Sequence, residues 1–88
     1  MKYKITKLDR RHNGFGSFKY FISPISYSNR VNDLIELRNW CWMTYGPGTE
    51  LKYFSVGNTW AWNTEFNHLK IYLRSDEEMV VFKLKYYG

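Results

Sequence analysis

The sequence holds a single cysteine, two prolines and two histidines in 88 residues, and it has no long hydrophobic run. With Cys41 alone, no disulfide can form within the chain, which excludes the disulfide-stapled class of small secreted proteins. Nowhere do about 18 apolar residues follow one another, and the first stretch, MKYKITKLDRR, lacks the apolar region of a secretory signal. We therefore expect a cytoplasmic protein without membrane contact, in which Cys41 is a small buried side chain.

The residues that active sites and metal centres require are also scarce. His12 and His68 fall in a predicted loop and on a predicted strand, with no further histidine or cysteine at metal-ligand spacing. Glu65 and His68 have the spacing of a helical metal pair, but they lie where a strand is expected. The stretch NGFGS lacks the lysine and the following helix of a phosphate-binding loop. We therefore expect a non-catalytic protein with no metal, no cofactor and no small-molecule substrate.

Aromatic residues and positive charges are abundant instead. Four Trp, eight Tyr and six Phe make up 20% of the chain, and the net charge is +5. A chain of this length forms one domain, 1–88, whose core is too small to hold so many rings. Some aromatic surface is therefore expected to be exposed or buried in an interface. The charge permits an acidic partner, nucleic acid included, but does not require one.

Alternation of apolar and polar residues predicts strands at 2–8, 18–25, 49–56 and 66–74. The basic stretch 9–17 is expected to be a turn-forming loop, and 57–65 a polar loop that carries Trp60 and Trp62. Ser28 is a candidate N-cap for a helix at 28–45, which Gly46 and Pro47 end.

The tail 75–87 fits two structures. Ser75 and Glu78 have the spacing of a capping box, which predicts a helix, whereas the alternation of the following residues would suit an edge strand. We favour the helix. The prediction is an α+β fold: an antiparallel sheet of three to five strands, the 28–45 helix packed on one face, and a short C-terminal helix or edge strand.

The two tryptophans of the 28–45 helix point in different directions. At 100° per residue they lie about 200° apart, so they cannot both face one core. The predicted core-facing stripe consists of Val31, Leu34, Ile35, Cys41, Trp42 and Tyr45. Arg38 falls inside this stripe. We expect its stem to lie along the core with the guanidinium in water; the alternative is a pair with a carboxylate such as Glu50 or Glu65.

Trp40 is left on the polar side of this helix with Met43 beside it. Two interpretations are open. Either the 57–65 loop folds over Trp40, or Trp40 and Met43 form an apolar patch where a partner or a second copy docks. The candidate partner-contact residues are Trp40, Met43, Trp60 and Trp62.

Basic residues interleaved with rings indicate a second kind of surface. Single-stranded nucleic acid is bound by such mixtures, because rings stack on bases and cations follow the phosphates. Lysine and tyrosine are also common on the solvated face of a sheet, and no RNP-type or GXXG signature is present. The candidate nucleic-acid-binding residues are Lys4, Arg10, Arg11, Lys19, Tyr20, Lys70, Tyr72 and Arg74.

The stretch NWCWMTYGPG, followed by a strand, and the terminal KIYLRSDEEMVVFKLKYYG resemble short uncharacterised proteins of tailed bacteriophages, of the T4-like and marine type. In those proteins a Trp-rich helix ends at a glycine turn, and a strand, an acidic cap and an x-F-K-L-x-aromatic unit close the chain. The resemblance covers about half of this chain. It implies a viral origin, a location in the host cytoplasm and a helical tail, and it brings no activity or site residue. The chain departs from it at MVV, where the relatives have small residues.

We therefore expect a small basic viral protein that acts through protein–protein contact or self-association as a homo-oligomer, using an aromatic patch. The alternative is a single-stranded nucleic-acid-binding protein that uses a basic and aromatic face of the sheet.

Overall fold

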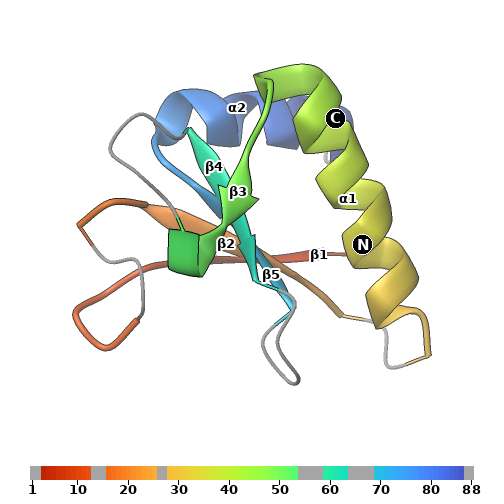
Figure 1. The fold of residues 1–88 in the computed structure, drawn as a ribbon, viewed down its shortest axis with the longest axis horizontal. Coiled ribbons are helices and arrows are strands. Elements are labelled where there is room, and N and C mark those ends of the chain that lie inside the picture. Colours follow the sequence, from red (N-terminus) through yellow and green to blue (C-terminus); the bar gives the residue numbers. More distant parts are fainter. Residues whose placement is uncertain (1–2, 13–15, 26–27, 54–58, 64–68, 87–88) are drawn as a thin grey trace.

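The computed structural model in Figure 1 describes residues 3–12, 16–25, 28–53, 59–63 and 69–86. Its strands are β1 (Tyr3–Lys7), β2 (Tyr20–Pro24), β3 (Thr49–Glu50), β4 (Trp60–Asn63) and β5 (Lys70–Leu73). Its helices are α1 (Arg30–Tyr45), α2 (Asp76–Tyr86) and the single 3-10 turn η1 (Leu51–Tyr53).

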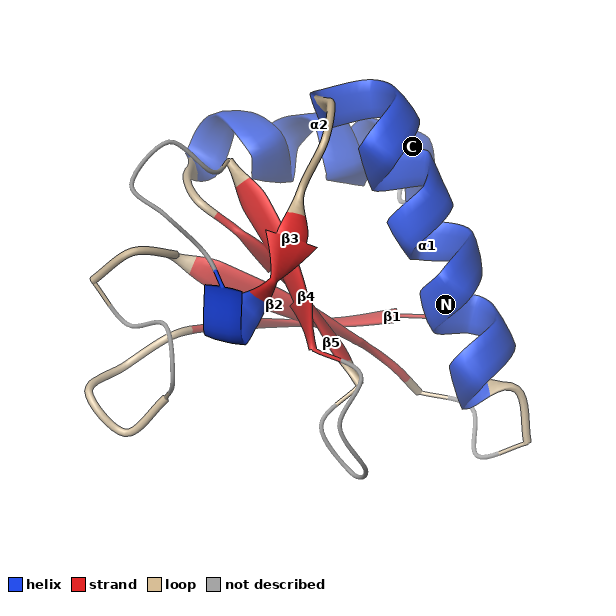
Figure 2. Ribbon diagram, in the orientation of Figure 1, coloured by secondary structure: helices blue, strands red, loops and turns tan. Residues whose placement is uncertain are grey.

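The strands form one mixed sheet in the order β1-β2-β5-β4-β3. Neighbouring strands are antiparallel except β3 and β4, which run parallel. Both α-helices pack on one face of this sheet, α1 as the main helix and α2 as the short C-terminal one (Figure 2). The predicted α+β fold class is confirmed, but the sheet is mixed and not wholly antiparallel as predicted, because β3 runs parallel to β4.

The tail is a helix because its first turn is capped as the sequence indicates. The Glu78 carboxylate accepts hydrogen bonds from the Ser75 backbone N–H at 3.1 Å and from the Ser75 hydroxyl at 2.9 Å. Three acidic residues occupy the first turn and two lysines the last, which suits the helix dipole. These local terms favour the helix over the edge strand that the alternation also allowed.

Three local predictions are wrong. The helix start is one: α1 begins after Asn29, which caps it without a side-chain hydrogen bond, so Ser28 is not the N-cap. The predicted strand at 49–56 is a two-residue strand followed by η1, and its residues 54–56 lie outside the described ranges. The predicted loop at 57–65 contains strand β4. The turn-forming residues around the short alternating run WAWN favour a loop, which is why the sequence does not predict this strand.

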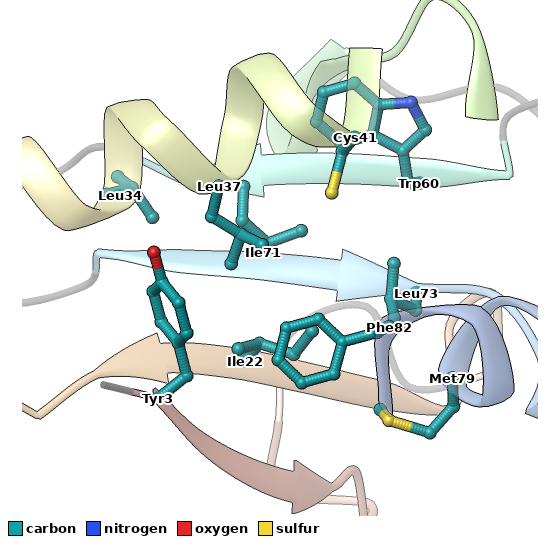
Figure 3. Packing of buried hydrophobic residues seen from close by; sticks show 10 residues of the cluster. All are labelled: Tyr3, Ile22, Leu34, Leu37, Cys41, Trp60, Ile71, Leu73, Met79 and Phe82. Atoms are coloured by element: carbon teal, nitrogen blue, oxygen red, sulfur yellow. The ribbon is translucent and has the colours of Figure 1, made fainter. Parts of the chain in front are cut away.

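The main core lies between the sheet and the two helices (Figure 3). It consists of Tyr3, Ile22, Leu34, Leu37, Cys41, Trp60, Ile71, Leu73, Met79 and Phe82. Every strand except β3 contributes to it, and so do both α-helices. Successive strand residues alternate between the two faces of a sheet, so the residues between these ones point to the opposite face.

That opposite face carries a second, smaller cluster of Leu8, Phe18, Phe21, Ala61 and Tyr72. Leu8 and Phe18 come from the two ends of the β1–β2 connection, where the Leu8 N–H donates to the Lys19 carbonyl oxygen at 2.9 Å. The connection therefore covers part of the sheet that the sequence pattern assigns to solvent. As a result, the central strand β5 is buried on both faces.

Candidate protein-contact surface

The face that α1 turns toward the sheet differs from the predicted one. Leu34, Leu37 and Cys41 are buried, whereas Val31 and Ile35 are exposed. The true stripe is rotated toward Leu37 because α1 packs against two neighbours, the sheet on one side and α2 on the other. A projection of the isolated helix cannot include the second neighbour.

The two tryptophans of α1 exchange the roles predicted for them. Trp40 packs partly buried against the main core, with ring centroids 5.5 Å from Tyr45, 6.3 Å from Phe82 and 5.5 Å from Tyr86. All three contacts are edge-to-face, and two of them come from α2. Trp40 is therefore covered by α2 and is not an exposed docking residue. Cover by α2 differs from both predicted positions of Trp40, under the 57–65 loop or on an exposed patch.

Tyrosine hydroxyls fix the position of α1 on this side. The Tyr3 hydroxyl donates to the Asp33 carbonyl oxygen at 2.8 Å, and the Tyr45 hydroxyl donates to the Glu78 carbonyl oxygen at 2.6 Å. Burial raises the pKa of both phenols well above the usual value. It also raises the pKa of Tyr86 to about 12. The β1–α1–α2 contact is therefore a hydrogen-bonded aromatic cluster that requires neutral phenols.

Trp60, the third predicted contact residue, is completely buried. Its indole N–H donates to the Gly46 carbonyl oxygen at 2.8 Å. Gly46 has a φ of 91°, which favours glycine, and a Cβ on Gly48 would lie 2.5 Å from the Trp60 ring. The GPG turn after α1 therefore ends the helix and also makes room for Trp60. The prediction that Trp60 is a contact residue is wrong.

Trp42, which the helical projection predicts to be a core residue, reaches the surface with 49% of its area exposed. Its ring centroid lies 6.3 Å from that of Trp60 and 6.4 Å from that of Trp62, and these two lie 5.3 Å apart. The three indoles form a cluster that begins in the core and ends at the surface. Trp42, the outermost ring, thus packs against two other indoles on its inner side and is exposed on its outer side.

Arg38 adds a charged group to this cluster. Its guanidinium carbon lies 5.4 Å from the centroid of the Trp62 ring, within the range of a cation–π contact. This contact was not among the two positions expected for Arg38. Together, the exposed flank of α1 and the adjoining strand β4 form what we call the tryptophan surface: Val31, Ile35, Arg38, Trp42 and Trp62.

Met43 lies outside this surface. It is 87% exposed, and one residue of helix turns it about 100° away from Trp42. Of the four predicted contact residues, the structure places only Trp62 in the tryptophan surface. Met43 is exposed elsewhere on α1, Trp40 is covered by α2 and Trp60 is buried.

Val31, Ile35 and Trp42 are exposed, although the helical projection predicts them to be core residues. The available signal was the width of the apolar arc around α1. The six residues of the predicted stripe, together with Leu37, Trp40 and Met43, are too widely spread to face one sheet. Such a helix has two apolar sides, and a second packing partner decides which of them is buried.

The candidate nucleic-acid residues are not gathered on one face. Tyr72 is buried in the second cluster, so its ring is not available for stacking on a base. The Asp76 carboxylate accepts hydrogen bonds from Lys19 Nζ at 2.7 Å and from the Tyr20 hydroxyl at 2.6 Å, and both hold the pKa of Asp76 below its usual value. Lys70 Nζ lies 4.4 Å from the centroid of the Phe21 ring on the side of the second cluster.

The remaining candidates are exposed cations. Lys4, Arg10 and Arg74 are exposed, and Arg11 pairs with Asp9 within the β1–β2 connection at 2.9 Å. The Arg11 side chain and backbone N–H together lower the pKa of Asp9 to about 2. Lys4 and Lys70 are each paired across the sheet with a polar residue, Ser23 and Asn63 respectively. By strand alternation Lys4 and Lys70 lie on the face of the second cluster, whereas Lys19 and Tyr20 contact Asp76 of α2. The candidates are therefore divided between two sides of the molecule, and the predicted nucleic-acid function stays a prediction.

Reactive groups are few in the described ranges. No set of three or more His, Cys, Asp or Glu residues there has the geometry of a metal site. Burial raises the pKa of the Cys41 thiol, so the side chain stays protonated. Within the same ranges, no helix has the length and apolar character needed to cross a bilayer.

Comparison of the chain with protein-family models, with curated proteins and with solved structures finds no match, so the resemblance to phage proteins is a prediction from the residues alone.

Proposed function

We propose that this chain is a non-catalytic cytoplasmic binding protein whose tryptophan surface contacts another protein. The observation that carries the proposal is Trp42, which is half exposed and held by the Trp60 and Trp62 rings. Tryptophan and arginine are the residues most enriched at binding hot spots. A ring that is already fixed loses little conformational entropy when a partner covers it.

The surroundings of Trp42 support an interface with a protein. Val31 and Ile35 are exposed on the same side of α1, and Arg38 is the only charged member of the tryptophan surface. Interface centres are depleted of charge and enriched in aromatic residues and arginine. The net charge of +5 and the position of Arg38 favour a partner that combines an apolar patch with a carboxylate.

The test has two steps. A photo-crosslinking residue at Asn39, which is exposed next to Ile35 and Trp42, identifies the protein that lies against this surface in the producing cell. That protein is then purified and titrated by calorimetry with the wild type, Trp42→Ala and Leu84→Ser. Leu84 is an exposed apolar residue of α2 and serves as the matched control.

We expect Trp42→Ala to weaken binding at least about tenfold, a loss of about 1.4 kcal/mol, while Leu84→Ser binds like the wild type. Equal affinity of Trp42→Ala and the wild type would contradict the proposal. A single-stranded oligonucleotide is titrated in parallel at low and high salt. Binding to it that weakens steeply with salt would favour the nucleic-acid function instead.

A further inference from the structure

Helix α2 has an apolar face on each side. Met79 and Phe82 point into the main core, whereas Val80, Val81 and Leu84 are exposed, Leu84 by 72%. Val80 and Val81 lie four and three residues before Leu84, the spacing of side chains that share one face of a helix. Figure 1 shows α2 at the margin of the molecule, where this outer side is accessible.

Charge is distributed along this outer face with opposite signs at its two ends. Glu77 lies before the apolar residues and Lys85 after them, and both side chains are exposed. At 100° per residue, Glu77, Val80, Val81, Leu84 and Lys85 fall within an arc of about 140°. The outer face of α2 is thus an apolar strip with an acid at one end and a base at the other.

A second copy of α2 fits this pattern when it runs antiparallel. Glu77 and Lys85 each lie four residues from Val81. A twofold axis near Val81 therefore places Glu77 of each copy beside Lys85 of the other and brings the apolar strips together. A parallel pair would instead place like charges side by side.

We propose that the outer face of α2 is a self-association surface, on which two copies of the chain pair through antiparallel α2 helices. The strip carries one acid and one base, so it offers no net charge to attract nucleic acid. The surface is separate from the tryptophan surface on α1, and either proposal stands if the other fails.

The pairing is expected to be weak. A stable interface buries about 1,600 Å² in total, more than one helix of 11 residues provides. The dimer should therefore form reversibly, with the monomer present at low concentration.

Sedimentation equilibrium of the full chain over a wide concentration range tests the proposal. The wild type is expected to approach twice the mass of one chain at the highest concentrations. Val81→Glu places two carboxylates against each other at the twofold axis and should leave a monomer throughout. Ile35→Glu is the matched control, because Ile35 on α1 is 42% exposed and Val81 is 39% exposed, and it should dimerise like the wild type.

A charge exchange tests the antiparallel orientation. Glu77→Lys and Lys85→Glu each convert two attractions into two repulsions, and each should weaken the dimer about tenfold. The double variant restores opposite charges and should return the dissociation constant to within about threefold of the wild type. Circular dichroism and thermal unfolding confirm that each variant is folded. If a charge reversal unfolds α2, Leu84→Ser, which leaves the helix ends unchanged, replaces it and should also weaken the dimer.

Three results would overturn the proposal. One is a wild type that stays monomeric at every concentration. Another is a dimer that Val81→Glu leaves intact. The third is a dimer that Ile35→Glu disrupts, because the tryptophan surface would then be the place where copies meet.

Discussion

The two flanks of α1 each carry a tryptophan, and these two tryptophans differ in burial. On one flank, Trp40 lies against Phe82 and Tyr86 of α2, partly buried and next to hydrogen-bonded tyrosines. On the other flank, Trp42 lies against Trp60 and Trp62 and keeps half of its area in solvent. The first tryptophan joins two helices, whereas the second ends a cluster at the surface. The difference shows that a ring's role depends on which elements pack beside it.

Removing the α2 ring that packs against Trp40 should have the largest effect on stability. Phe82 is completely buried and contacts both Trp40 and Tyr3. Phe82→Ala should lower the free energy of unfolding by about 3–5 kcal/mol, because a cavity forms where two helices and the sheet meet. Urea unfolding measures the loss, with Phe82→Leu as a milder variant. A loss below about 1 kcal/mol would mean that α2 contributes little to the core.

Truncating each tryptophan in turn compares the two flanks directly. Trp40→Ala should lower the free energy of unfolding by about 2–4 kcal/mol, because it removes contacts within the core. Trp42→Ala should cost about 1 kcal/mol, since the removed ring is half exposed. Urea unfolding of both variants under one set of conditions gives the ranking. The reverse order would mean that Trp42 is the core residue, as the helical projection predicted.

Gly48→Ala should disturb the packing of Trp60, the buried ring of the tryptophan cluster that includes Trp42. The new methyl group would lie 2.5 Å from the Trp60 ring, so the ring must move. Overpacking of this kind costs about 1–3 kcal/mol. Thermal unfolding measures it, together with tryptophan fluorescence, which should shift because Trp60 contacts Trp42 and Trp62. Thr44→Ala, an exposed change on α1, is the control. Unchanged fluorescence and stability in Gly48→Ala would refute this packing.

Alkaline pH should lower the free energy of unfolding through the tyrosines on the Trp40 side of α1. This effect is the smallest of those predicted, because it is absent near neutral pH. Tyr3, Tyr45 and Tyr86 lie there, and burial raises their pKa values in the folded protein, that of Tyr86 to about 12. The folded state thus holds these protons more tightly than the unfolded state, whose phenols titrate near pH 10. The stabilisation is complete below about pH 10 and is lost as the pH rises further.

Thermal unfolding between neutral and strongly alkaline pH, with phenolate absorbance recorded in parallel, checks this dependence. Tyr86→Phe should reduce its slope. Tyr53→Phe, a change at an exposed tyrosine of η1, should leave the slope unaltered. A melting temperature independent of pH above about 10 would contradict the prediction.

The sequence by itself determined the elements whose signals are local. The Ser75–Glu78 capping box produced α2, and the glycine turn ended α1 at Tyr45. Alternation located β1, β2 and β5, and one helix with several strands set the α+β class. These features depend on neighbours in the chain, so pattern and propensity suffice to find them.

Only the tertiary structure decided which rings are buried. α2 covers Trp40 and leaves Trp42 outside, strand β4 carries Trp60 into the core, and the β1–β2 connection covers Tyr72. Each outcome depends on an element distant in sequence that buries one apolar side of a helix or strand having two. A periodic pattern shows which sides of an element are apolar, but burial stabilises only the side that a neighbouring element covers. The candidate contact surface is the apolar side that α1 retains after both of its neighbours have packed.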